Sequence, residues 1–317
     1  MFHAIIEASM IEDTLKAWAA GKGYDIAWGP GTLIGEVRSE IVGRCARGEL
    51  DPVCIDKWFG WARDPGEASA APETAIAVAI PCSARAVRFT HGGRVFTAVI
   101  PPTYVEDFSD NEQVRQELRD LLPKLHGDLE LIGPARKALA VRLGLTTYGL
   151  NNITYSAKLG SYVLIVALAT SARLGSWPLA KNRRPEVLNE CESCGRCRDA
   201  CPTGAISQDR FLLRAERCLT CWNELPGPLP AWFPADAHNS LIGCMVCQEV
   251  CPCNAGLLTT RDSGVLFDEK ETAALLAGED PMAPGLNASI EAKLGVVGLP
   301  GIRNVLGRNL SLLLKVT

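Results

Sequence analysis

A chain of 317 residues is long enough for one large domain or for two domains of ordinary size. Its hydrophobic content of 47% allows a sizeable core, yet no apolar stretch reaches the length that a membrane-spanning helix needs. The net charge of −4 and the pI near 5.7 exclude a global basic field that would hold nucleic acid by its phosphates.

Cysteine is unusually frequent, with 13 in the chain. The first residues lack the basic and apolar regions of a secretory signal peptide. Many thiols without an export signal are typical of a reducing compartment, where cysteine binds metal and disulfide frameworks are rare. We therefore expect a cytoplasmic protein with metal sites.

Helices and strands mix through the first 180 residues. Helical spacing of apolar residues predicts helices at Ile11–Ala20, Thr32–Gly48, Asn111–Leu122 and Pro134–Leu145. Gly23 is expected to end the first of these, and Asp110 is expected to cap the third. Short apolar runs predict strands at Ala75–Ile80, Val95–Ile100 and Tyr162–Leu168, of which the last is fully apolar and hence central. This mixture predicts a layered α/β (α+β) domain over residues 1–180.

The second half of the chain is expected to be less regular. A polar linker, Pro178–Pro185, leads into a cysteine-rich module over residues 181–258, where metal coordination replaces a large apolar core. Residues 259–317 are expected to form a helical tail, with helices at Phe267–Ala277 and Pro300–Leu314.

Two cysteine runs carry the chemistry. Cys191–Pro202 holds three cysteines at two-residue gaps and a fourth three residues on, followed by proline. This is the bacterial ferredoxin spacing, in which three thiolates hold one cube and the fourth ligates the other. The second run, Cys244–Pro252, also closes with cysteine and proline. Structural zinc is the alternative, but it explains neither the third cysteine at the same gap nor the prolines. The spacing predicts two [4Fe–4S] clusters.

The ferredoxin rule divides the ligands into two sets. The first cluster takes four cysteines, namely Cys191, Cys194, Cys197 and Cys251. The second cluster takes three cysteines, namely Cys201, Cys244 and Cys247, and needs a fourth ligand. Either Cys218 or Cys221 must complete it; we favour Cys218, and Cys221 remains a competitor.

With the residues before it, the double-cluster arrangement resembles the epoxyqueuosine reductases, cobalamin-dependent enzymes of queuosine synthesis, and their reductive dehalogenase relatives. The cluster run concerned is Gly243–Pro252. The upstream part consists of Arg142–Leu145, the turn Tyr148–Tyr155, Gly160–Ser161 and an apolar strand that ends at Thr170. The resemblance covers roughly residues 75–257.

The resemblance implies a nitroreductase-like N-terminal domain that binds cobalamin, to whose cobalt the clusters deliver electrons one at a time. An acid then supplies a proton. Counting back from Arg142 places Glu130 at the position of the family's proton-donating aspartate, with Asp128 two residues earlier. Tyr155, in the turn that resembles the family, is a further candidate for the proton donor. Contacts to the cofactor are expected from Tyr104, Tyr148, Gly149, Asn151, Asn152, Gly160 and Ser161.

The carboxylates, tyrosines and asparagines among these residues also have structural alternatives: a solvated loop carboxylate, a buried tyrosine bonded to the backbone, and an asparagine that caps a turn. The chain departs from the family at Leu219–Asn223, which replaces a Ser-Tyr-Thr context, and in the short segment 259–317 where long members carry helical repeats. These departures and the acidic charge lead us to expect a small-molecule or modified-nucleoside substrate, with tRNA possible but not favoured.

The expected partner is an external electron donor of the ferredoxin or flavodoxin type, and no membrane. Two other functions stay open at this point. One is a cobalamin-free electron carrier or corrinoid-activating partner protein. In the other, the N-terminal domain binds a flavin or an organic substrate directly.

Overall fold

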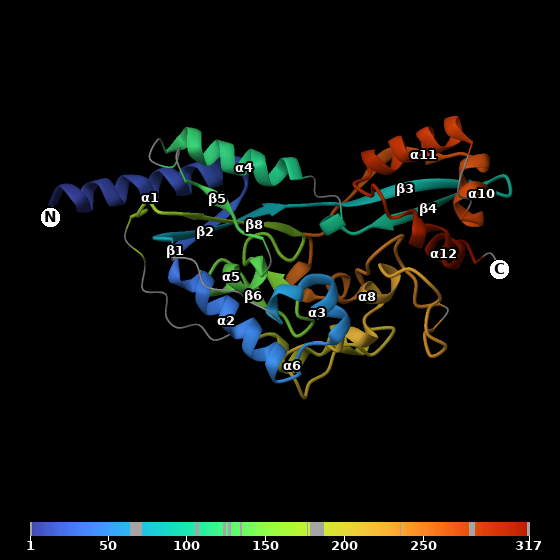
Figure 1. Cartoon of the computed structure of the whole chain (residues 1–317), viewed down its shortest axis with the longest axis horizontal. Coiled ribbons are helices and arrows are strands. Elements are labelled where there is room, and N and C mark those ends of the chain that lie inside the picture. The colour runs from blue at the N-terminus through green and yellow to red at the C-terminus, as the bar shows by residue number, and fades with distance from the viewer. Residues whose placement is uncertain are drawn as a thin grey trace. The chain divides into compact units, whose positions relative to one another are not determined.

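The computed structural model describes residues 2–63, 72–104, 108–122, 125, 128–133, 135–175, 177, 187–234, 236–278 and 283–315. The chain divides into two units (Figure 1). Unit 1 comprises Met1–Pro81 and Asp107–Cys194, and unit 2 comprises Cys82–Glu106 and Gly195–Thr317. Residues 82–106, expected in the N-terminal domain, thus group with the C-terminal part. The predicted linker Pro178–Pro185 lies outside the described residues.

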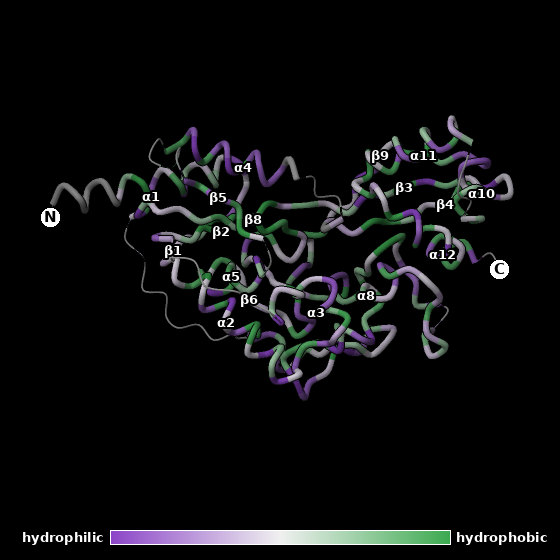
Figure 2. Tube along the Cα trace, in the orientation of Figure 1, coloured by the Kyte–Doolittle hydropathy of each residue, from purple (hydrophilic) through white to green (hydrophobic). Residues whose placement is uncertain are grey.

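Unit 1 is organised around a four-stranded antiparallel sheet. Its order is β1 (Asp25–Pro30), β2 (Thr74–Pro81), β8 (Val163–Thr170) and β5 (Glu130–Leu131). Nearly all residues of β2 and β8 are buried, and Figure 2 shows both as hydrophobic. Because helices cover both faces, these strands carry the continuous apolar runs by which the sequence predicted them.

Those helices form two outer layers (Figure 1). Helices α1 (Phe2–Lys22) and α4 (Phe108–Leu121) lie on one face of the sheet, and α2 (Thr32–Ala46) and α5 (Arg136–Arg142) lie on the other. Trp18 Nε1 of α1 donates to a Glu117 oxygen of α4 at 3.2 Å. Arg142 of α5 donates to Glu40 of α2 at 2.8 Å. The layered arrangement confirms the predicted mixed α/β (α+β) class.

Three helices of unit 1 differ from the prediction at their ends. Ile11–Ala20 lies inside the longer α1, which ends just before Gly23, whose φ of 73° breaks the helix. Asp110 lies in the first turn of α4 and is not its cap. Helix α5 occupies only part of Pro134–Leu145, of which Pro134 is outside the described residues.

Strand β1 and helix α3 (Pro52–Trp58) are among the elements of unit 1 that were not predicted. Strand β1 contains Gly29 and Pro30, which disfavour a strand in sequence but are tolerated at this sheet edge. Helix α3 has proline at its first position, and its cap Asp51 accepts the Val53 N–H at 2.8 Å.

Unit 2 contains a three-stranded sheet in the order β4 (Arg94–Ile100), β3 (Ala84–His91) and β9 (Thr260–Phe267). Strands β3 and β4 form a hairpin, and β9 runs parallel to β3. The prediction of a helix from Phe267 is wrong at its start, because Phe267 ends β9. Helix α10 (Glu269–Ala277) begins after its cap Asp268, whose side chain accepts the Glu271 N–H at 2.9 Å.

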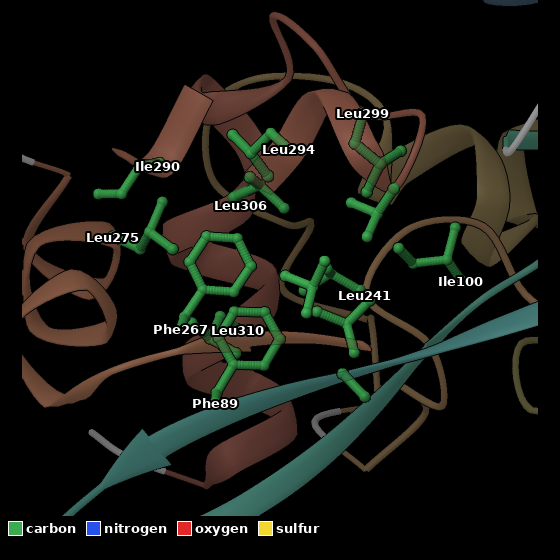
Figure 3. Close-up of a cluster of buried hydrophobic side chains, with 14 of the residues drawn as sticks. Phe89, Ile100, Leu241, Phe267, Leu275, Ile290, Leu294, Leu299, Leu306 and Leu310 are labelled. Atoms are coloured by element: carbon green, nitrogen blue, oxygen red, sulfur yellow. The ribbon is translucent and has the colours of Figure 1, made fainter. Parts of the chain in front are cut away.

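The main core of unit 2 lies between this sheet and the C-terminal helices. These are α10, α11 (Pro284–Val296), which was not predicted, and α12 (Arg303–Leu314). Phe89 of β3 and Phe267 of β9 stack with ring centroids 4.9 Å apart (Figure 3). Leu241, from the cysteine-rich segment, joins the same core. Residues 259–317 are therefore part of this core as well as a helical tail.

The cysteine-rich segment has only short helices, as predicted for a metal-stabilised module. They are α6 (Cys191–Cys194), α7 (Arg196–Asp199), α8 (Leu219–Asn223) and α9 (Val246–Glu249). Among the described residues no helix is long and apolar enough to cross a membrane.

Candidate metal and cofactor sites

Three predicted ligands of the second cluster lie near one another in unit 2. Burial raises the pKa of the Cys218 thiol to about 11, and the proximity of Cys244 adds to the rise. Burial also raises the pKa of Cys244, with Cys201 nearby. Thiols this reluctant to ionise need a cationic partner to become thiolates, which is what bound iron supplies. The donor set therefore fits a metal cluster.

N–H donors point at predicted ligand sulfurs. Ala205 N donates to Cys201 Sγ at 3.3 Å, and Asn239 Nδ2 donates to Cys244 Sγ at 3.2 Å. Such bonds stabilise thiolates and tune the potential of iron–sulfur clusters. In the described part of the chain no three Cys, His, Asp or Glu side chains are placed to hold a single metal ion. A cube differs in that each of its ligands binds a separate iron atom.

The two candidates for the remaining ligand occupy different places on α8. Cys218 is the N-cap residue of α8, before its first turn, and lies close enough to Cys244 for that thiol to add to the rise of its pKa. Cys221 lies inside the helix and is 3% exposed. This placement supports Cys218, which stays a prediction.

A buried pair of asparagines fixes the two segments that carry Cys218 and Cys244. Asn223, at the end of α8, accepts the Gly243 N–H at 2.9 Å and donates to the Gly243 carbonyl at 2.6 Å. Asn309 Nδ2 of α12 donates to the carbonyls of Asn223 and Leu241 at 2.9 and 3.1 Å. Both asparagines are fully buried. Helix α12 therefore supports the ligand loops.

Sequence reasoning missed these asparagines. The available signal was a polar residue at an apolar position, since Asn309 follows Leu306 and precedes Leu310 on the core side of α12.

Tyr104 belongs to unit 2, whereas the other predicted cofactor residues belong to unit 1. Its hydroxyl donates to a carboxylate oxygen of Glu224. Burial raises the pKa of Tyr104 well above its usual value, and Glu224, Cys218 and Cys244 add to the rise. Tyr104 thus lies beside two predicted ligands of the second cluster.

The other predicted cofactor residues gather in one polar turn of unit 1. Strands β6 (Thr147–Tyr148) and β7 (Thr154–Tyr155) form an antiparallel pair. At the turn between them, Asn151 Nδ2 donates to the Tyr155 hydroxyl at 2.8 Å. A Cβ at Gly149 would lie 2.7 Å from both the Asn151 Oδ1 and the Tyr155 ring, so this position requires glycine. Asn151 and Tyr155, both buried, therefore hold each other in place.

Three further residues complete this region. Asn152 adopts a left-handed conformation, with φ of 61°. Gly160 exchanges backbone hydrogen bonds with Ser156 at 2.9 and 3.0 Å, and Ser161 is buried beside it. The Thr146 hydroxyl is buried with no hydrogen-bond partner among the described residues. Burial raises the pKa of Tyr148 to about 12, so its hydroxyl stays neutral.

The turn also contacts a predicted ligand of the first cluster. The Leu188 N–H donates to the Tyr148 carbonyl at 2.8 Å, and Val187 forms a parallel bridge with Tyr148. The segment just before α6 therefore runs alongside β6. The Leu150 N–H then donates to Cys191 Sγ at 3.4 Å. A predicted cluster ligand and the predicted cofactor turn are thus in direct contact inside unit 1.

The two predicted carboxylates lie at another part of the sheet. Glu130, on β5, is exposed and is opposite Ala169. Asp128 accepts the Thr170 hydroxyl at 2.8 Å and also the Ser171 N–H. Burial acts to raise the pKa of Asp128, but these hydrogen bonds outweigh it and hold the pKa below its usual value. Asp128 is therefore tied to the end of β8 as a charged group, an arrangement that disfavours proton donation.

Comparisons with known proteins agree with the cysteine geometry. Residues 190–254 match a family model described as a 4Fe-4S double cluster binding domain. The epoxyqueuosine reductase of Bacillus subtilis (strain 168) is 33% identical over 147 residues, which are 44% of this chain and 36% of that protein. The Lactococcus garvieae enzyme is 31% identical over 148 residues, 45% of this chain and 40% of that protein. The matched segment thus spans less than half the length of these curated relatives.

Solved structures extend the likeness of the fold to nearly the whole chain. Epoxyqueuosine reductase from Streptococcus thermophilus superposes with a TM-score of 0.63 at 19% identity, covering 96% of this chain and 80% of that chain. An epoxyqueuosine reductase bound to an epoxyqueuosine-modified tRNA-Tyr stem loop gives 0.64 at 22% identity, covering 97% and 81%. The chain is therefore similar to epoxyqueuosine reductases in sequence over part of its length and in fold over nearly all of it, and its residues 190–254 match a 4Fe-4S double cluster binding domain.

Proposed function

We propose that this protein is an iron–sulfur reductase that passes electrons through two [4Fe–4S] clusters to cobalamin bound in unit 1. The observation that carries the proposal is the hydrogen bond from the Leu150 N–H to Cys191 Sγ at 3.4 Å, within unit 1. It joins the turn expected to face the cofactor to a thiol expected to hold a cluster. When bound, the clusters supply one-electron transfer.

The ligands we propose for the first cluster are Cys191, Cys194, Cys197 and Cys251. Those for the second are Cys201, Cys218, Cys244 and Cys247, all of which belong to unit 2. The N–H donors on Cys191, Cys201 and Cys244 support thiolate ligation, because each offsets part of the sulfur's negative charge.

The turn Tyr148–Tyr155 and the neighbouring Ser161 are the residues we propose to hold the cofactor. Gly149 lacks a side chain where the backbone bends sharply, and Tyr148 supplies a neutral hydroxyl. The unpaired Thr146 hydroxyl supports a bound polar group, because a buried hydroxyl without a partner is costly. Cobalamin, when bound, supplies a redox-active metal that accepts electrons from the clusters and reduces the substrate.

The proton donor is proposed to be Glu130 or Tyr155. Glu130 is exposed and so can exchange protons with solvent, whereas Asp128 is held by two hydrogen bonds at the end of β8. Tyr155 is buried and already accepts the Asn151 amide, which orients its hydroxyl.

The substrate we propose is a modified nucleoside. Charge led us to disfavour tRNA, but a structural relative is described with an epoxyqueuosine-modified tRNA stem loop. That likeness supports a nucleoside carried by RNA over a free small molecule. A ferredoxin or flavodoxin type of protein is the proposed electron donor.

Anaerobic reconstitution with iron and sulfide tests the clusters. The full chain is expected to bind about eight irons, four for each cluster, and Cys218→Ala is expected to lose about half of them while Cys221→Ala keeps them. Zinc in place of iron, or about four irons in the unmodified chain, would refute the two-cluster proposal. The reverse result for the two variants would move the ligand to Cys221.

Cobalamin is tested next on the same material. Stoichiometric binding, seen as a change in the visible and EPR spectra of added cobalamin, is expected. If cobalamin does not bind while the clusters are intact, the electron-carrier function is favoured. If a flavin binds in place of cobalamin, the alternative in which the N-terminal domain binds a flavin directly is favoured. Mass spectrometry then compares how far the protein reduces an epoxyqueuosine-modified stem loop and the free nucleoside. The one that is reduced identifies the form of the substrate.

A further inference from the structure

Beside the predicted ligands of the second cluster, unit 2 holds a tyrosine–glutamate pair to which the proposed function gives no role. Tyr104 ends the short helical turn Pro102–Tyr104 that follows β4. Glu224 is the C-cap residue of α8. The Tyr104 hydroxyl donates to a Glu224 oxygen, and the Tyr104 ring packs against Gly243, the residue before Cys244.

The pair lies next to Gly243, the residue before Cys244. A Cβ on Gly243 would lie 2.5 Å from the Tyr104 ring and 2.9 Å from its hydroxyl oxygen, and Gly243 has a φ of 69°. Both requirements exclude a side chain here. Asn223, next to Glu224, binds the N–H and carbonyl of the same glycine. Tyr104 thus packs against the loop that carries Cys244, and Glu224 follows directly on the residue that binds this loop.

The electrostatic consequence follows from which partner carries charge. The Tyr104 hydroxyl is the donor and the Glu224 carboxylate the acceptor, so Tyr104 contributes a dipole and Glu224 contributes a negative charge. Reduction of a cluster adds an electron, which a nearby negative charge disfavours, and the potentials of such clusters depend on local charge and hydrogen bonding.

We propose that Tyr104 and Glu224 together set the reduction potential of the second cluster, an inference that rests on the proposed ligand set of that cluster. Glu224 lowers the potential. Tyr104 moderates this effect, because its hydroxyl binds the carboxylate and offsets part of the charge. Tyr104 is thus a positioning residue that tunes the second cluster, a role different from the cofactor contact that the sequence predicted for it.

An EPR-monitored redox titration of the reconstituted full-length protein tests this inference. Glu224→Gln is expected to raise the midpoint potential of one cluster and leave the other unchanged. Tyr104→Phe is expected to lower the potential of the same cluster. In the Glu224→Gln background, Tyr104→Phe is expected to add no further shift, since the hydroxyl acts through the carboxylate. Glu291→Gln on α11, whose partner is Arg303, is the control and is expected to leave both potentials unchanged.

Unchanged potentials in both variants, at full iron content, would overturn the inference and leave the two-cluster proposal intact. Loss of about half the iron from either variant would also overturn it, because the pair would then be a structural support. Failure of the proposed function itself is seen separately, in the iron content of the unmodified chain.

Discussion

Truncation of Asn309 to alanine is the sharpest test of how α12 supports the predicted cluster ligands. The Asn309 amide donates two hydrogen bonds, of 2.9 and 3.1 Å, to the carbonyls of Asn223 and Leu241. Asn223 and Leu241 are 0% and 1% exposed, so water cannot easily replace the lost donor. Leaving a buried acceptor unsatisfied costs about 1–3 kcal/mol, so two of them give about 2–4 kcal/mol after partial relaxation.

This cost converts into a measurable shift. For a unit of about 150 residues, 1 kcal/mol corresponds to roughly 3 °C in Tm. Asn309→Ala is therefore expected to lower, by roughly 6–12 °C, the Tm of the transition in which the reconstituted protein loses its visible cluster absorbance. The matched control is Ser311→Ala on the same helix, whose side chain bonds only to the Arg308 carbonyl at 2.8 Å. The control is expected to lose at most about 1 kcal/mol.

The assay is anaerobic thermal unfolding, followed together by circular dichroism and visible absorbance. If Asn309→Ala unfolds within a degree or so of Ser311→Ala, the buried amide does not hold the ligand loops. If the circular dichroism changes but the cluster absorbance melts as in the unmodified protein, α12 stabilises unit 2 without supporting the clusters.

Three other substitutions have defined outcomes in thermal unfolding. Asp128→Asn is expected to lower Tm at neutral pH, because the hydrogen bonds that depress the pKa of Asp128 stabilise its charged form. The difference is expected to shrink as pH falls below the ordinary aspartate value of 3.8, and a difference that stays the same below that pH contradicts this. Asp268→Ala removes the N-cap of α10 and is expected to cost about 1 kcal/mol, and a neutral result would mean that the capping box contributes nothing. Phe267→Ala is expected to cost about 3–5 kcal/mol, well above Leu266→Ala on the exposed face of β9, and equal losses would refute the stacked core.

What the sequence could predict depended on whether the information was local. The cluster ligands are predicted from local information, because the spacing of the cysteines along the chain is what distinguishes the ferredoxin pattern. Strands β2 and β8 are also recognised locally, since both of their faces are covered and they carry continuous apolar runs. Strand β9 contains charged residues and Gly264, and it pairs with β3 from a distant part of the chain. No local pattern marks such a strand.

The candidate site divides in the same way. Tyr104 could not be placed from sequence, because its position depends on the β3–β4 hairpin joining unit 2. Asn151 and Tyr155 were correctly located in one turn, but their bond to each other comes from the fold of that turn. Glu130 and Asp128 were found by counting along the chain, which takes no account of the hydrogen bonds that restrain Asp128.

The parallel pairing of β3 with β9 has a consequence for biosynthesis. Ala84 aligns with Thr260, so the hairpin leaves the ribosome long before its partner strand exists. Until β9 and the C-terminal helices have been synthesised, the apolar side of the hairpin around Val87 and Phe89 stays exposed to solvent. This exposure favours slow folding and dependence on chaperones. A fragment cut after the second cysteine run would keep that surface exposed permanently, so we expect it to aggregate even though it contains every thiol predicted to bind metal.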